Sequence, residues 1–473
     1  MRSPEERKRR HRNERIVAAI VVLVAAALTA GLWLYSQRLD EEHEREATYI
    51  PTPTVVTPEV ELVRQYIRFD TSNPPGNEMP AAQWLAGLIR AAGLEAEVIE
   101  SAPGRGNVYA RIEGKRDGSG LLLLHHIDVA PAREAEWSHP PFEGVIRLDH
   151  LYGRGALDMK SVGIVFLRAF LDVAASGRQP EHDLVFLAVA DEEAGGTWGM
   201  KWLLEHRPHV VEGVRYALNE GGITEMSAER VTYYGIEVGS KIHTTVEVVA
   251  PARGQLQQAR IALEPWFTPD PEPHRVLPEV RRFFRDIAPQ RIQFREWLAD
   301  IDGTIARGKF WRLPIGYREL TQNNVFVWQI EPRPEGDFRM AVTFLSLPDE
   351  EPAGRIEWLT EVIAPFGARI ERVRNAAEPV PVSSANTPFY ELLAREASAE
   401  FQAPAGTEFL SRSSSDSRFL RRRGIDAYGI NPFAVDFFQS ESIHAADERL
   451  RVAYFVRGLE FTRRLIRTWA FPA

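Results

Sequence analysis

Groups of histidine and acidic residues stand directly after apolar runs at several points of this 473-residue chain. Residues 126–128 (His-Ile-Asp) follow the apolar run 121–124, and residues 191–193 (Asp-Glu-Glu) follow the run 184–190. Three adjacent carboxylates repel one another, and a nearby cation relieves that repulsion. Cysteine is absent, so His, Asp and Glu must supply the ligands of any metal. These residue types therefore predict a metal site made of imidazoles and carboxylates.

The first of these groups allows two interpretations. In an extended segment, residues two apart point the same way, so Asp128 can reach the imidazole of His126. A carboxylate in that place orients a metal-bound histidine. A polar turn after a strand would have the same sequence, and the pair alone does not distinguish the two.

Three further residues belong to the same kind of pattern. Asp158 lies in a glycine-bearing loop, 153–160, that opens a helix, and taken alone it is more typical of a helix N-cap. Glu220 follows the short apolar segment 216–218, and His444 stands just before the closing helix. Because an α/β enzyme keeps its site at the carboxyl ends of its strands, these residues are candidates to join the two acidic groups.

The elements that must position these residues alternate along the first part of the chain. Apolar periodicity predicts strands at 95–99, 108–112, 121–124 and 184–190, and helices at 80–94, 159–175 and 196–206. Alternating strands and helices are typical of a doubly wound, mostly parallel α/β sheet. We therefore expect an α/β catalytic domain that begins near residue 59.

The pattern changes near residue 240. Alternating residues predict half-exposed strands at 241–249 and 338–344. Helical stretches at 279–287 and 355–363 accompany them. Two helices on one face of a small antiparallel sheet form an α+β layer. After residue 378 the α/β pattern returns, with a helix at 388–400, a strand at 427–430 and a helix at 450–469. The sequence thus predicts catalytic segments at 59–239 and 373–473, interrupted by an inserted α+β lid of the dimerisation type at 240–372.

The N-terminus predicts a membrane anchor. Residues 16–35 carry no charge, and a helix of that length at ~1.5 Å per residue reaches ~30 Å, the thickness of one hydrocarbon core. Seven Arg and Lys against three Glu precede this run, and an acidic stretch at 40–46 follows it. By the positive-inside rule we expect a cytoplasmic tail at 1–15, a single transmembrane signal anchor at 16–35, a stalk at 36–58 and a body exported to the periplasm or another extracytoplasmic space. A cleaved signal peptide is the alternative.

The overall charge narrows the classes of function. The formal net charge is −9, and no long basic run occurs outside the first fifteen residues. Proteins that bind nucleic acids need basic faces to neutralise phosphate, so we expect no nucleic-acid partner.

The histidine and acidic groups described above follow one another along the chain in a characteristic order. In that order they resemble the motifs of the co-catalytic zinc peptidase family of aminoacylase, carboxypeptidase S, glutamate carboxypeptidase and succinyl-diaminopimelate desuccinylase. The resemblance begins with residues 70–78 (DTSNPPGNE) and ends with the His444 motif, so it covers nearly all of the chain beyond the stalk. Residues 137–142 (WSHPPF) and 415–419 (SDSRF) belong to it as well.

The resemblance implies how five residues would bind two metal ions. His126 and Glu220 would bind one ion, and Glu193 and His444 the other, with Asp158 bridging both. Zinc, with two ions per chain, is the expected metal, and Mn²⁺ or Co²⁺ could replace it at such a mixed site. A lid-mediated homodimer, common among relatives, is a further expectation.

The resemblance also implies a reaction. Glu192 would be the general base, taking a proton from water and passing it to the leaving amine, while Asp128 would orient His126. The substrates would be N-acyl amino acids or short peptides, cut at an amide bond beside a free carboxylate. An exported dipeptidase or carboxypeptidase uses the same chemistry, and a non-catalytic anchored binding protein on the same fold is the remaining alternative.

Two positions concern the substrate. Arg418 could grip a substrate carboxylate, because its planar fork suits bidentate pairing, or it could be a surface residue in the basic run 418–423. The family's lid usually carries a Gly-His-Ser segment whose His reaches the site, and here Gln255 stands in that place. Gln can donate a hydrogen bond but carries no charge. His243, nearby in the sequence, is expected to be an ordinary strand residue.

Overall fold

The structure is a computed structural model that describes residues 55–472, apart from 223, 228–229, 264–273, 375–378, 411–414 and 436. Residues 56–473 form one compact unit. The predicted tail at 1–15, the predicted anchor at 16–35 and nearly all of the predicted stalk lie outside the described residues. Within the described part, no helix combines the length and the apolar character needed to cross a membrane.

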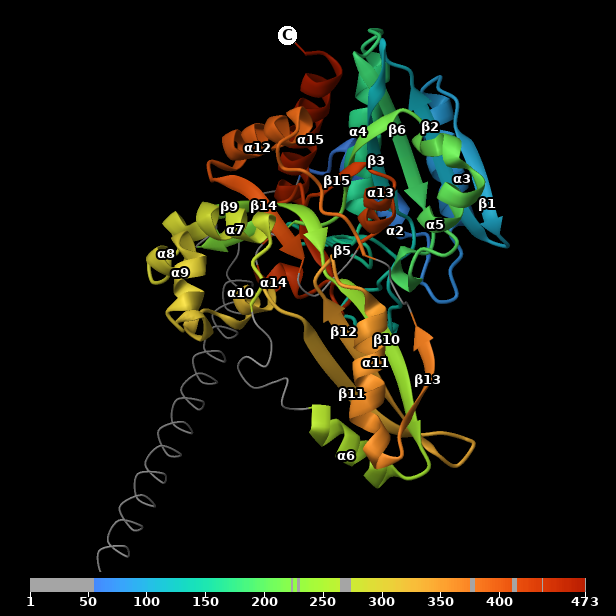
Figure 1. The fold of residues 1–473 in the computed structure, drawn as a ribbon. Coiled ribbons are helices and arrows are strands. Elements are labelled where there is room, and N and C mark those ends of the chain that lie inside the picture. Colours follow the sequence, from blue (N-terminus) through green and yellow to red (C-terminus); the bar gives the residue numbers. More distant parts are fainter. Residues whose placement is uncertain are drawn as a thin grey trace, which may run out of the picture. The chain divides into compact units, whose positions relative to one another are not determined.

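The larger sheet is mixed and has a parallel centre (Figure 1). Its strands lie in the order β1-β2-β6-β3-β7-β15-β9-β14, and β8 pairs with β9. Their bounds are β1 (Glu97–Ala102), β2 (Arg105–Ile112), β3 (Arg116–His126), β6 (His182–Val189), β7 (Val214–Asn219), β8 (Thr224–Ser227), β9 (Arg230–Ser240), β14 (Ala405–Leu410) and β15 (Asp426–Gly429). The central strands β6, β3, β7 and β15 are parallel, whereas the β1–β2, β2–β6 and β15–β9 pairs are antiparallel. The predicted α/β sheet with a parallel core is confirmed.

Strand β3 carries its side chains into two separate cores. Leu121 and Leu123 belong to one apolar core, and Leu122 and Leu124 belong to a second core. Successive side chains of a strand point to opposite faces, so a continuous apolar run is what a strand covered on both sides requires.

Helices cover both faces of this sheet. The first core includes residues of α2 (Pro58–Ile67), α3 (Met79–Ala91), α4 (Lys160–Ala175), α12 (Pro388–Phe401) and α15 (Val452–Ala470). The second core includes residues of α5 (Met200–His206) and α13 (Ser417–Arg422). Helix α4 approaches the sheet closely at Gly163, where an added Cβ would lie 2.4 Å from the ring of His125.

A second sheet is antiparallel, with the strand order β11-β12-β10-β13. Its strands are β10 (Ile242–Ala250), β11 (Asn324–Pro332), β12 (Phe338–Ser346) and β13 (Arg369–Arg374). Helices α6 (Arg253–Leu263) and α11 (Pro352–Ile363) pack on it, with Leu256 and Leu359 in one core with Val246. These elements form the α+β layer expected of the lid, and we refer to residues 242–263 and 324–374 as the lid.

The helix predicted at 279–287 forms, but its assignment to the lid was wrong. Helix α7 (Pro278–Ile287) is followed by α8 (Arg295–Ala299), α9 (Ile301–Ala306) and α10 (Ile315–Glu319), and we call residues 278–320 the helical arm. Phe283 and Phe284 of α7 share a core with Tyr233 of β9 and Phe409 of β14. The apolar face of α7 therefore covers the larger sheet, and α6 takes the place of the second lid helix.

A small sheet joins the last part of the chain to the segment before α4. It consists of β4 (Val145–Arg147), β5 (His150–Tyr152) and β16 (Arg449–Arg451), in the order β16-β5-β4. The short helix α14 (Phe437–Ser440) precedes β16 in the chain. Because β16 pairs with β5, the His444 loop is tied to the segment that leads to Asp158.

Candidate metal centre

Three of the five predicted ligands follow the carboxyl ends of adjacent strands, and the other two lie in loops. His126 ends β3, Glu193 lies in a short turn after β6, and Glu220 directly follows β7. Asp158 lies just before α4, and His444 lies in the loop before β16. Because β6, β3 and β7 are neighbouring and parallel, their carboxyl ends meet at one edge of the sheet.

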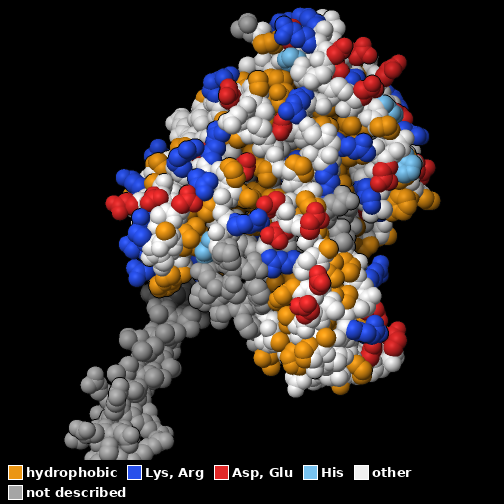
Figure 2. Space-filling view, in the orientation of Figure 1, with side chains coloured by type: hydrophobic (Ala, Val, Ile, Leu, Met, Phe, Trp, Pro, Cys, Tyr) orange, Lys and Arg blue, Asp and Glu red, His pale blue; other side chains and the backbone are white. Residues whose placement is uncertain are grey.

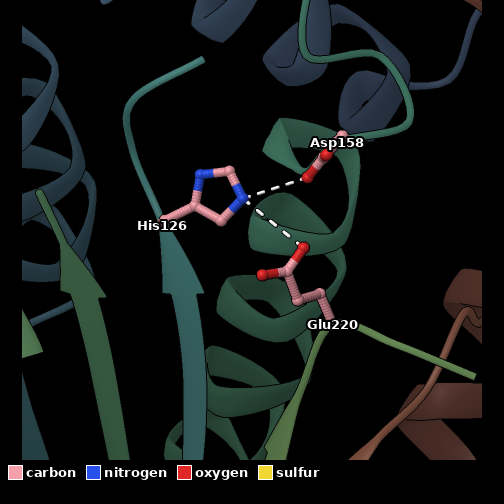
Figure 3. Close-up of side chains that lie close together, drawn as sticks. All are labelled: His126, Asp158 and Glu220. Carbon is pink, nitrogen blue, oxygen red and sulfur yellow. Dashed lines mark hydrogen bonds and ion pairs between the residues drawn. The ribbon is translucent and has the colours of Figure 1, made fainter. Parts of the chain in front are cut away.

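The first group of ligands consists of His126, Asp158 and Glu220 (Figure 3). The Nε2 atom of His126 lies 3.0 Å from Oδ1 of Asp158 and 3.6 Å from Oε2 of Glu220. The close-up shows both carboxylates turned toward this nitrogen. The imidazole of His126 is almost completely buried. The described contacts of its Nε2 atom are with these two carboxylates.

The second group consists of Asp158, Glu193 and His444. The Nε2 atom of His444 lies 3.1 Å from Oδ2 of Asp158 and 3.1 Å from Oε1 of Glu193. In each group the ligand atoms lie within 4.8 Å of one another. Asp158 thus presents one carboxylate oxygen to each group, as a bridging ligand does.

Two residues of this crowded, carboxylate-rich site have raised pKa values. Burial raises the pKa of Glu220 to about 7, and the charge of Asp158 adds to this effect. Hydrogen bonds to Asp158 and Glu193 raise the pKa of His444 to about 10. The carboxylates therefore favour added positive charge beside them, and divalent cations would provide it.

The orientation of His126 also suits a metal. Its Nδ1 donates a hydrogen bond to the backbone carbonyl of Asp128 at 2.8 Å, which leaves the lone pair of Nε2 free for ligation. The carboxylate of Asp128 also lies near this nitrogen, with Oδ1 3.7 Å from Nδ1, which is an ion-pair distance. That this carboxylate orients the ring stays a prediction. Two imidazoles and three carboxylates, with Asp158 shared by both groups, fit two divalent cations with mixed nitrogen and oxygen ligands, such as zinc.

The carboxylate of Asp128 has a different task. It accepts hydrogen bonds from the backbone N–H groups of Glu192 and Glu193, each at 3.1 Å. It also accepts one from Nδ2 of Asn73 at 2.9 Å. Asp128 therefore fixes the turn that carries both of these acidic residues.

A buried network of charged side chains also holds the turn at residues 191–193. Asp191 has a positive φ of 71°, and its carboxylate accepts hydrogen bonds from Asn73 at 3.0 Å and from Arg105 at 2.8 Å. Arg105 also pairs with both oxygens of Glu78, which is fully buried. Sequence reasoning placed Asp191 in the acidic triplet without a role, and it gave no role to Arg105 or Glu78.

Glu448 fixes the loop that carries Asp158. Its buried carboxylate accepts hydrogen bonds from the backbone N–H groups of Gly155, Leu157 and Asp158 at 2.7–3.1 Å. It also pairs with the guanidinium of Arg154 at 2.8 Å. Glu448 stands four residues after His444 in a motif that the sequence singled out, yet nothing in the motif shows this contact.

Arg418 lies beside Glu192 and is not a surface residue. Its Nη1 is 3.6 Å from Oε1 of Glu192, and its Nη2 donates to the carbonyl of Gly195 at 3.1 Å. The guanidinium stacks over the ring of Phe419 at 4.4 Å. The side chain is 14% exposed, so the alternative of a solvated surface arginine is wrong.

Glu192 itself belongs to neither ligand group, and its side chain is 12% exposed. Burial raises its pKa well above the usual value for a glutamate, and the charges of Glu220 and Asp416 add to this shift. The nearby cationic Arg418 opposes the shift without abolishing it. A carboxyl group in such surroundings can hold a proton at higher pH than an exposed glutamate does.

The two lid residues differ in their surroundings. Gln255 lies on α6, where its side chain accepts a hydrogen bond from the backbone N–H of Ala252 at 3.0 Å and lies beside Gly367. None of its described contacts involves a ligand of either group. His243 lies half-buried on β10, and burial together with the charge of Arg418 lowers its pKa to about 4.

Comparisons with known proteins agree with this geometry. A family model described as peptidase family M20/M25/M40 matches residues 122–468. Aminoacylase-1 of Sus scrofa is 26% identical over 419 residues, covering 87% of this chain and 95% of its own length. A probable carboxypeptidase S-like protein of Dictyostelium discoideum is 24% identical over 377 residues, covering 73% of this chain and 71% of its own length.

A solved structure shares the fold. The crystal structure of an M20 family metallo-carboxypeptidase from Sulfolobus solfataricus superimposes with a TM-score of 0.66 at 19% sequence identity. The match covers 88% of this chain and 99% of the archaeal protein.

Proposed function

Because the chain belongs to peptidase family M20/M25/M40 and is a metal-dependent hydrolase, we propose that it cleaves the amide bond of N-acyl amino acids, with two zinc ions and Glu192 as general base. The observation that carries this proposal is the position of Asp158 between two ligand groups, with one oxygen toward His126 and the other toward His444. A curated relative named aminoacylase-1, matched over most of both chains, supports the choice of substrate class.

The ligand groups define where the ions would bind. His126 and Glu220 would hold one ion, Glu193 and His444 the other, and Asp158 both. When bound, two such cations lower the pKa of water and polarise the scissile carbonyl.

The proton transfers fall to Glu192. Its carboxylate is free of both ligand groups and is fixed through its backbone by Asp128. The raised pKa brings it closer to the operating pH of a general base than an exposed glutamate. In the proposed reaction, Glu192 takes a proton from the attacking water and gives it to the nitrogen of the leaving amine.

Arg418 is proposed to bind the carboxylate of the substrate. It lies beside Glu192, and its planar fork can form two parallel hydrogen bonds with a carboxylate. A dipeptidase or carboxypeptidase would use the same residues, since dipeptides and N-acyl amino acids share an amide bond next to a terminal carboxylate. This second candidate is favoured by the carboxypeptidase S-like relative.

We further propose that residues 16–35 anchor the enzyme in a membrane and that the body is exported. The supporting features are the uncharged run and the excess of Arg and Lys before it. Alkaline extraction of membranes, followed by protease digestion of intact and opened cells, tests this location. Release of the full chain by alkaline carbonate would contradict the anchor.

The test of the reaction uses the compact body, residues 56–473. Bound metal is measured by elemental analysis, and hydrolysis is assayed with pooled N-acyl amino acids and dipeptides. Glu192→Ala is compared with Glu205→Ala, which changes an exposed glutamate of α5. About two zinc ions per chain, with hydrolysis lost only in Glu192→Ala, is the expected result.

Other outcomes would redirect the proposal. Two bound ions without turnover of any substrate would favour a binding protein on the same fold. No bound metal after zinc supplementation would exclude the two-ion reaction. Turnover of dipeptides alone would select the peptidase activity.

A further inference from the structure

Three large apolar side chains of the helical arm point into solvent. Ile292 is 82% exposed, Trp311 is 55% exposed and Ile315 is 60% exposed. Single exposed apolar residues are normal, but a group of them marks a surface that contacts a partner or a membrane. The question is whether the three lie together.

A hydrogen bond within the arm links the segments that carry them. Arg291, the neighbour of Ile292, donates a hydrogen bond from Nε to the hydroxyl of Tyr317 at 2.8 Å. Tyr317 belongs to α10, the helix that Ile315 opens, and Trp311 stands four residues before Ile315. The segment around Ile292 is therefore fastened to the turn that carries the other two.

These residues are exposed although the turn around them is well packed. In the same turn, Phe310 is 2% exposed and Leu313 is 3% exposed, and both belong to the core of the helical arm. That core already fills the inner side of the turn. Trp311 and Ile315 do not belong to that core and are exposed.

The charge around the apolar group is positive. Residues 291–318 contain six Arg and Lys against three Asp and Glu, in a chain whose formal net charge is −9. Two of these acids, Asp300 and Asp302, already pair with arginines of the arm. Lys309 and Arg312 are exposed on either side of Trp311, and the Arg312 guanidinium lies 5.3 Å from the indole ring. Figure 2 shows Lys and Arg side chains along the outer edge of the molecule at α8 and α9, with Asp, Glu and hydrophobic side chains among them.

We propose that this surface, formed by Ile292, Lys309, Trp311, Arg312 and Ile315, docks onto an anionic lipid membrane. Tryptophan prefers the interface between headgroups and acyl chains, and isoleucine side chains enter the apolar layer. Lysine and arginine beside them attract the phosphates of anionic lipids. Three apolar side chains are too few for a stable protein interface, which buries roughly 800 Å² on each partner.

The experiment measures binding of the body to vesicles. Residues 56–473 form their own compact unit with their own cores, so the body is tested without the predicted anchor. Sedimentation is compared between vesicles of pure phosphatidylcholine and vesicles that also contain phosphatidylglycerol. We expect binding to the anionic vesicles only, and weaker binding as salt is raised.

The variants locate the binding surface. Trp311→Ala combined with Ile315→Ser is expected to lower the partition coefficient at least about fivefold. Trp328→Ala is the matched control, because Trp328 is 59% exposed but lies on β11 of the lid. Both variants should keep the wild-type melting temperature and hydrolytic rate.

Clear results would overturn the proposal. Equal binding of the double variant and the wild type would place the lipid contact elsewhere, and absence of binding to anionic vesicles would exclude it. Self-association that disappears in the double variant, without vesicle binding, would assign the surface to a second copy of the chain. Analytical ultracentrifugation distinguishes that case.

Discussion

The side chain of Asp128 holds the main chain of Glu192 in place. Its Oδ1 accepts a hydrogen bond from the Glu192 N–H at 3.1 Å, while Oδ2 takes the next N–H along the chain. Asp128 follows β3 and Glu192 follows β6, so the contact joins the carboxyl ends of two adjacent strands. The position of the proposed base therefore depends on a carboxylate that never touches the reacting atoms.

Asp128→Asn should lower kcat about 10–100-fold with KM little changed, the range typical of residues that position ligands. An amide keeps the shape of the side chain but offers one oxygen and an NH₂ group to two N–H donors. The rate is measured with the best N-acyl amino acid, together with metal content. Asp117→Asn, at an exposed position of β3, the strand that Asp128 follows, is the control. A rate within about twofold of wild type would show that the turn keeps its shape without this carboxylate.

Substitution of the ligands should change the metal content in a graded way. His444→Gln removes a ligand of the second group only, so about one ion per chain should remain. Asp158→Asn weakens both groups and should leave fewer ions than His444→Gln does. Elemental analysis of both variants, prepared in parallel, gives the comparison. Equal metal content in the two variants would contradict the bridging position of Asp158.

Removal of the metal should destabilise the body. A ligand at 1,000 times its Kd stabilises the folded state by about 4 kcal/mol, and here the bound cation also relieves the repulsion among the carboxylates. Thermal unfolding is followed with a chelator and again after zinc is restored. The melting temperature should fall and then recover. An unchanged melting temperature would mean that no ion binds the folded state tightly.

Arg105→Met should cost about 3–5 kcal/mol of the free energy of unfolding, because it leaves the buried carboxylates of Glu78 and Asp191 without their cation. Urea denaturation measures the loss. Arg133→Met is the matched control, since Arg133 pairs with Glu136 on the surface and such pairs contribute about 0–1 kcal/mol. Similar losses in both variants would argue against the network.

The body should lose stability as the pH falls from 7 to 5, in part through His243. Its pKa is about 4 when folded and about 6.5 in an unfolded chain, so the unfolded state binds more protons between these values. This difference makes folding less favourable by about 2 kcal/mol at pH 5 than at pH 7. His243→Gln should flatten the pH dependence of urea denaturation. His206→Gln, at an exposed position of α5, is the matched control.

The sequence predicted the five candidate ligands, and the structure brings all of them into two groups around Asp158. For His126, Glu193 and Glu220 this was feasible because they follow strands, and the carboxyl ends of adjacent parallel strands meet. The roles of Asp158 and His444 came from the family resemblance. The sequence did not show which atoms of Asp128 would contact the imidazole ring. Strand β3 ends at His126, and the hydrogen bond to the ring is accepted by the backbone carbonyl of Asp128. The carboxylate of Asp128 lies 3.7 Å from the same nitrogen.

Other features had no signal in the sequence. Arg105 meets Asp191 across 86 positions of the chain, and Glu448 meets the Asp158 loop across about 290. The periodicity of apolar residues indicates which face of one helix or strand is buried. It does not show which distant residues pair with one another. The same limit explains the misplaced helix at 279–287. Its apolar face predicted a helix, but both sheets offer an apolar surface to cover.

The late position of Glu448 in the chain bears on how the protein is made. Translation proceeds from the N-terminus, so the strands that carry His126, Glu193 and Glu220 are synthesised long before residues 444–448. Until then, the loop around Asp158 lacks the acceptor for three of its N–H groups, and the second group lacks its imidazole. Until residues 444–448 have been made, the growing polypeptide can therefore neither complete the second ligand group nor fix the loop that carries the shared ligand Asp158.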